Sequence, residues 1–158
     1  MYQKLLFPPK YKKIGWWILI PATILGVLLL VTQAQPGWME WNVFAIMDEQ
    51  IMGETTIFGI IKTNISVTLV GIIFIVGALF VGFSKEKNED EFIAQTRLYA
   101  LLWAVFVNYI LLIIAFLFIY GLSFFSVMLY NMFTVLILFI IRFNYMLYKN
   151  SKTFAGDK

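Results

Sequence analysis

The sequence contains neither cysteine nor histidine. The first absence excludes disulfides and thiolate nucleophiles, and the second excludes imidazole bases and the commonest ligands of metals and haem. Charge is scarce as well, because Lys, Arg, Asp and Glu make up 13% of the 158 residues, about half the share found in water-soluble domains. Since 61% of the residues are hydrophobic, the chain is not a water-soluble domain, and we expect it to contact the lipid bilayer.

The longest uncharged run covers residues 98–141, 44 positions in all, and is broken only by a turn signal at 120–123. A helix rises about 1.5 Å per residue and the hydrocarbon core is about 30 Å thick, so this run predicts two consecutive spanning helices. Two further apolar windows, 16–32 and 65–83, are each flanked by lysine. The pattern predicts an all-α membrane protein with four transmembrane helices. The expected spans of this single membrane domain are residues 15–32, 64–83, 98–120 and 122–146, with an external segment at 33–63 and a cytoplasmic loop at 84–97.

The basic residues predict the orientation of these spans. Eleven of the twelve lysines and arginines lie in three places: before the first span, around the loop between the second and third spans, and at or after the inner end of the fourth span. The external segment holds only Lys62, against four acidic residues. By the positive-inside rule, both termini and the middle loop are cytoplasmic. Because the cations are divided by membrane side rather than gathered in one patch, no direct contact with nucleic acid is expected.

The external segment contains two runs rich in β-branched and aromatic residues, at 41–47 and 55–61. Two short strands joined through residues 48–54 would form a β-hairpin over the outer mouth of the bundle. Short helices lying parallel to the membrane surface fit nearly as well. The composition leaves these two structures open.

The loop after the second span holds the one dense cluster of charge. Glu86, Glu89 and Asp90 fall at i, i+3 and i+4, a spacing that could gather carboxylates around a divalent cation. A solvated helix start is favoured, because acidic residues complement the helix dipole there. Asn88 followed by Glu91 resembles a capping box and predicts a third helix from residue 89, with its first two turns in the cytoplasm. No metal or cofactor is expected. The candidate surface for a cytoplasmic protein partner comprises Glu86, Glu89, Asp90, Glu91 and Arg97.

Few polar residues lie within the predicted spans. Folding the last two spans about Gly121 places Asn108 level with Thr134 and about one turn from Asn131. Interhelical hydrogen bonds that fix the packing register are favoured, and a polar transport path is the alternative.

Small residues recur on one face of the second span. Gly71, Ala78 and Gly82, with Ile75, follow a smooth helical stripe, and Ala22 and Gly26 lie four apart on the first span. Small residues allow helices to approach closely. The stripe predicts either packing between the first two helices or the seam of a homodimer.

Several short segments resemble a family of small uncharacterised bacterial four-helix integral membrane proteins. They are the stretch 82–93 with Arg97, Leu102-Trp103-Ala104, Asn108-Tyr109 and Tyr130-Asn131-Met132-Phe133-Thr134, and the resemblance covers about residues 64 to 150. It implies four helices in a bacterial cytoplasmic (inner) membrane. It implies no activity, because none is assigned to the family.

No ionisable residue lies deep within any predicted span, and this disfavours an ion-coupled transporter. The leading hypothesis is a non-enzymatic integral membrane protein that acts through protein contacts, as a membrane anchor or as a regulator of a cytoplasmic partner. The alternative is a subunit of a passive channel or transporter in which Asn108, Asn131 and Thr134 line a path. A membrane enzyme is the third hypothesis, with the acidic cluster as its only candidate site.

Overall fold

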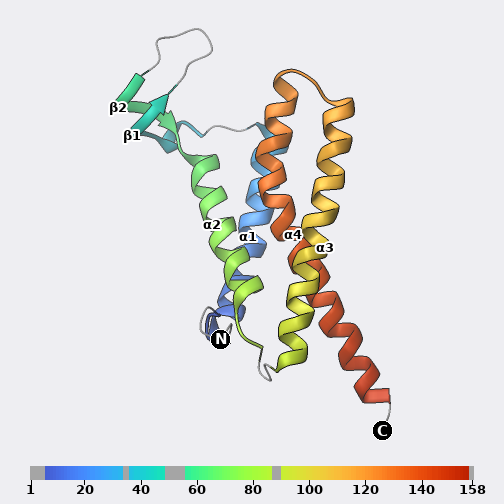
Figure 1. Cartoon of the computed structure of the whole chain (residues 1–158). Helices are drawn as coiled ribbons and strands as arrows, with labels where there is room; N and C mark the ends of the chain where they lie inside the picture. Colours follow the sequence, from blue (N-terminus) through green and yellow to red (C-terminus); the bar gives the residue numbers. More distant parts are fainter. Residues whose placement is uncertain (1–5, 34–35, 49–55, 87–89, 157–158) are drawn as a thin grey trace. The chain divides into compact units, whose positions relative to one another are not determined.

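The computed structural model describes residues 6–33, 36–48, 56–86 and 90–156 (Figure 1). It is mostly helical and contains four helices long and apolar enough to cross a membrane. They are α1 (Lys10–Thr32), α2 (Ser66–Phe83), α3 (Glu91–Phe118) and α4 (Leu122–Gly156). The predicted fold class is therefore confirmed.

The segment between α1 and α2 contains a β-hairpin rather than interfacial helices. A short 3₁₀ turn (η2, Gly37–Met39) leads into β1 (Glu40–Asp48), which pairs with β2 (Thr56–Asn64) in antiparallel register from Glu40 opposite Asn64 to Asp48 opposite Thr56. The β-branched and aromatic composition of the two runs suits a pleated pair of strands. Of the two structures left open by the sequence, the hairpin is the one found.

The chain divides into two compact units, one formed by Met1–Leu19 with Ile75–Lys158 and the other by Ile20–Phe74. The first contains the beginning of α1, the end of α2, and all of α3 and α4. The second contains the remainder of α1 and α2 together with the hairpin.

In the first unit, α3 and α4 pack against each other as an antiparallel pair (Figure 1). The buried face of α3 carries mostly small side chains: Ala100, Ala104 and Ala115 lie on it together with Asn108. Small residues let helix backbones approach closely in a membrane. The turn between the helices requires Gly121, whose φ of +69° lies in the left-handed region, where a Cβ atom is disfavoured.

Glycines also set the approach of α1 and α2 within the first unit. A Cβ atom on Gly15 would lie 2.8 Å from the backbone nitrogen of Val81, and one on Gly77 would lie 3.0 Å from that of Leu19. Both distances are shorter than van der Waals contact. The two helices therefore meet along their own backbones at these positions.

In the second unit, Asn64 joins the hairpin to α2. Its side-chain amide donates to the carbonyl of Pro36 at 2.9 Å, and its Oδ1 accepts from the backbone N–H of Ser66 at 3.0 Å. The backbone N–H of Ile65 donates to the carbonyl of Met39 at 3.1 Å. These bonds satisfy backbone groups at the junction, where neither the strand ladder nor the helix can do so.

Candidate functional site at the start of helix α3

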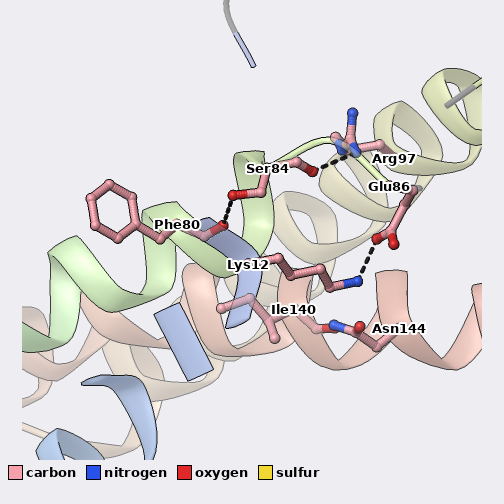
Figure 2. A network of polar contacts seen from close by, with 7 residues as sticks. All are labelled: Lys12, Phe80, Ser84, Glu86, Arg97, Ile140 and Asn144. Atoms are coloured by element: carbon pink, nitrogen blue, oxygen red, sulfur yellow. Dashed lines mark hydrogen bonds and ion pairs between the residues drawn. The ribbon is translucent and has the colours of Figure 1, made fainter. Parts of the chain in front are cut away.

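A cluster of polar contacts lies where α3 begins, and all four helices contribute to it through residues of the first unit (Figure 2). We call it the polar cluster and define it by Lys12 of α1, Ser84 and Glu86 after α2, Arg97 of α3 and Phe143 of α4. Its positive groups lie at the predicted cytoplasmic ends of their spans, as the positive-inside rule expects.

The segment before α1 is held against the end of α2 by the backbone. The N–H of Phe7 donates to the carbonyl of Phe83 at 3.0 Å, and the N–H of Lys85 donates to the carbonyl of Phe7 at 2.9 Å. The ring of Phe7 also lies edge-on to that of Phe80, with centroids 5.1 Å apart. This short parallel bridge fixes where α1 begins relative to the residues that follow α2.

Lys12 and Glu86 form an ion pair within the cluster. Each side chain is only 19% exposed, so solvent screens this pair less than it screens a surface pair. The Lys12 ammonium also lies 5.8 Å from the centroid of the Phe143 ring, within reach of a cation–π interaction. The carboxylate of Glu86 is therefore held by an internal partner.

Arg97 is the most buried charged residue that the structure describes, at 7% exposed. Its Nη2 donates to the carbonyl of Ser84 at 3.1 Å, and its guanidinium lies 5.0 Å from the centroid of the Phe143 ring. The Ser84 hydroxyl donates in turn to the carbonyl of Phe80. Because the last carbonyls of a helix lack partners within the helix and carry partial negative charge, a cation beside the end of α2 is stabilising.

The predicted partner surface therefore divides into two parts. Glu86 and Arg97 lie in contacts within the protein, whereas Asp90 and Glu91 are exposed. Glu89 lies outside the described residues. The accessible part of the surface is the first turn of α3, where Phe92 is also exposed.

The beginning of α3 differs from the sequence expectation by two residues. The N-cap is Asp90, whose backbone is extended and whose side chain accepts from the N–H of Ile93 at 2.8 Å; Asn88, the predicted cap, lies outside the described residues. The helix consequently begins at Glu91 and not at residue 89. An aspartate N-cap satisfies an orphan donor of the first turn directly, so no capping box is needed to start the helix.

The structure brings together two of the three predicted intramembrane polar residues. The side-chain amides of Asn108 on α3 and Asn131 on α4 each donate to the other's oxygen at 3.1 Å. Thr134 donates instead to the carbonyl of Tyr130 on its own helix, at 2.9 Å. The paired amides fix the register between α3 and α4, because sliding either helix would leave both groups unsatisfied in an apolar environment.

The residues of the predicted small-residue stripe on α2 lie in different environments. Ala78 is fully buried, and a Cβ atom on Gly82 would lie 2.6 Å from the Phe139 ring of α4. Gly71 is half-buried and belongs to the other unit. Gly77, where a Cβ atom would lie 3.0 Å from the backbone nitrogen of Leu19 on α1, lies one residue away from the stripe, and no spacing in the sequence singles it out.

Sequence reasoning missed most of the polar cluster. In the sequence, Lys12 indicated only the orientation of the first span. Nothing distinguished Ser84 or Phe143 from other residues at the ends of spans. A polar serine directly after an apolar run was the available signal. Among the described residues, no three Asp or Glu side chains gather as a metal site would require; the proposed trio includes Glu89, which lies outside them.

Comparison with protein-family models, with curated proteins and with solved structures gives no match. The family resemblance is therefore not supported by these comparisons.

Proposed function

We propose that this integral membrane protein is not an enzyme and acts through protein contacts, anchoring or regulating a cytoplasmic partner at the first turns of α3. The observation that carries the proposal is the division of this segment into two faces. Thr96 and Arg97 are buried, and Arg97 is tied to the end of α2. Glu91, Phe92 and Gln95 are exposed.

The exposed face suits recognition by a protein. It combines acidic side chains with the apolar ring of Phe92, and interfaces commonly pair an aromatic anchor with a polar rim. The polar cluster holds the base of the helix in place, so the face is presented on a rigid element. A preorganised surface loses less conformational entropy on binding than a mobile loop does.

The polar cluster itself supports a structural role. Its carboxylate is paired with an ammonium group, and its guanidinium donates to a backbone carbonyl. General acid–base catalysis instead needs a titratable group within reach of a substrate. For the channel alternative, the buried Asn108 amide is already paired with Asn131, an arrangement that supports helix packing over a polar path.

The proposal is tested by photo-crosslinking in native membranes. A photoreactive residue at Gln95 probes the exposed face, and one at Tyr109 is the matched control, because it lies about four turns further along nearly the same face of α3 and is also exposed. We expect a soluble protein to be captured at Gln95 and not at Tyr109. Capture only of further copies of this chain would contradict the proposal and support a self-assembled channel.

Charge neutralisation gives an independent check on the same surface. The double variant Asp90→Asn/Glu91→Gln removes both charges and keeps an N-cap, because asparagine caps helices as well as aspartate does. We expect capture at Gln95 to fall about fivefold, the effect of losing about 1 kcal/mol at an interface. Glu40→Gln, at an exposed acid on β1, is the control and should leave capture unchanged.

A further inference from the structure

The second arginine of the α3–α4 pair has a different environment from Arg97. The guanidinium of Arg142 on α4 lies 4.9 Å from the centroid of the Trp103 ring on α3. Its Nε is buried and donates to no acceptor among the residues that the structure describes. Neither of the ion pairs found in that part of the chain, Lys12 with Glu86 and Lys62 with Glu40, includes Arg142.

The two helices that form this contact offer Arg142 no nearby carboxylate. The sequence of α4 contains no acidic residue, and α3 contains only Glu91. Glu91 lies twelve residues before Trp103, or about 18 Å along the helix. The positive charge of Arg142 is thus not neutralised by either helix of the pair.

A guanidinium that lies over an aromatic ring is still able to bind an anion. A cation–π contact uses the flat face of the group, whereas the N–H donors lie in its plane and match the oxygens of a phosphate in a bidentate fashion. The residues around the contact supply further donors. Trp103 is 40% exposed, Tyr99 one turn before it is 64% exposed, and Tyr145 one turn after Arg142 is 56% exposed.

Because α3 and α4 are antiparallel (Figure 1), Tyr99, which precedes Trp103, and Tyr145, which follows Arg142, both lie from this contact toward the same end of the helix pair. That end is where the predicted spans meet the membrane interface. Arg142 itself lies four residues before residue 146, the predicted limit of the fourth span. In the other direction the exposed neighbours are apolar, among them Phe106 and Ile141. Donors on one side and apolar side chains on the other match the headgroup and acyl chains of a lipid.

We propose that Arg142, stacked on Trp103, binds the phosphate of an acidic phospholipid, with Tyr99 and Tyr145 beside the headgroup. The phosphate supplies the negative charge that α3 and α4 lack, and the acyl chains cover Phe106 and Ile141. A free phosphate ion offers the same oxygens without the acyl contacts. A basic site between spanning helices on the cytoplasmic side suits acidic lipid headgroups.

The site is tested by native mass spectrometry of the purified full chain in detergent, titrated with phosphatidylglycerol. We expect Arg142→Gln to lower phosphatidylglycerol affinity about tenfold, as loss of a charge-assisted bidentate contact predicts. Lys13→Gln removes one exposed charge elsewhere and should leave the affinity unchanged. An equal loss in both variants would overturn the proposal in favour of diffuse electrostatic attraction.

Two further measurements keep the test decisive even when Arg142→Gln does not fold. Arg142→Lys keeps the charge but not the planar donor pair, so we expect it to weaken lipid binding while Lys13→Arg does not. In the unaltered protein, phosphatidylglycerol should raise the melting temperature more than phosphatidylcholine or inorganic phosphate at matched concentration. Equal stabilisation by phosphatidylcholine would contradict recognition of an acidic lipid, and equal stabilisation by inorganic phosphate would identify a free anion as the ligand.

Discussion

At the scale of single residues, burial and partners decide what each charged or polar group does. Arg97 and Arg142 are chemically identical and each has a buried Nε without an acceptor among the described residues, yet the Nη2 of Arg97 donates to a backbone carbonyl, whereas the guanidinium of Arg142 lies over the Trp103 ring. Asn108 and Asn131 donate to each other, so both amides are paired between the helices. In a bilayer this matters more than in water, because no solvent replaces a lost partner.

The paired amides give a prediction for stability. Asn108→Leu should destabilise the protein by about 1 to 2 kcal/mol, because it removes two hydrogen bonds and leaves Asn131 unsatisfied. Asn108→Leu/Asn131→Leu should cost less than the sum of the single variants. A double-mutant cycle of the free energy of unfolding in detergent measures the coupling, and simple additivity would contradict the pairing.

The close approach of α2 to α4 gives a second prediction. Gly82→Ala places a methyl group against the buried ring of Phe139, and we expect a loss of about 1 to 3 kcal/mol, typical of overpacking. Gly26→Ala is the matched control, because the nearest atom to its Cβ, on Val70, is 3.6 Å away. The control should be neutral or stabilising, since alanine favours helix by about 1 kcal/mol over glycine. Thermal unfolding of both variants distinguishes packing from propensity.

At the scale of elements, α3 combines a cap, an exposed start and a packed length. Asp90 caps the start of the helix, and Arg97 in the second turn donates to the carbonyl of Ser84 at the end of α2. The alanines that follow are buried along the rest of the helix. The hairpin shows the opposite situation, since its two strands make a single ladder and expose Phe44 and Ile60. Two strands alone are marginally stable in water, so the attachment of the hairpin to α2 through Asn64 matters.

The cap of α3 can be tested directly. Asp90→Ala should destabilise the first turn by about 1 kcal/mol, because the N–H of Ile93 loses its acceptor. Hydrogen exchange of amides 92–94 should accelerate about fivefold in that variant. Asp90→Asn keeps the acceptor, and we expect its exchange rates to match those of the unaltered protein. Equal acceleration in both variants would point to charge, rather than capping, as the origin of the effect.

At the scale of the whole molecule, four apolar helices long enough to cross a membrane define the class of protein. Most of their large apolar side chains are exposed in the isolated chain, which is expected where lipid, not protein, is the surrounding solvent. The polar cluster and all the lysines and arginines except Lys62 belong to segments that the sequence assigns to the cytoplasmic side. The orientation itself remains a prediction from charge distribution.

The absence of cysteine makes that orientation testable. Single-cysteine variants at Lys13, Gln95 and Trp38 place a thiol at exposed positions before the predicted first span, at the start of α3 and beside the hairpin. We expect a membrane-impermeant maleimide added to intact cells to label Trp38→Cys alone. Labelling of the other two should require permeabilised cells. The reverse pattern would invert the predicted topology.

The sequence by itself determined the class, a mostly helical membrane protein, and its four long apolar helices. Each of these follows from local hydrophobic length, which the chain carries without reference to its other parts. The pairing of Asn108 with its partner helix could be anticipated, because a tight turn at Gly121 sets the register of a helical hairpin. The close approach at Gly15 and Gly77, the burial of Arg97 and the contact of Arg142 with Trp103 depended on tertiary structure. They involve helices brought together by packing, and in spans that are apolar on every face no periodic pattern marks which face will meet a neighbour.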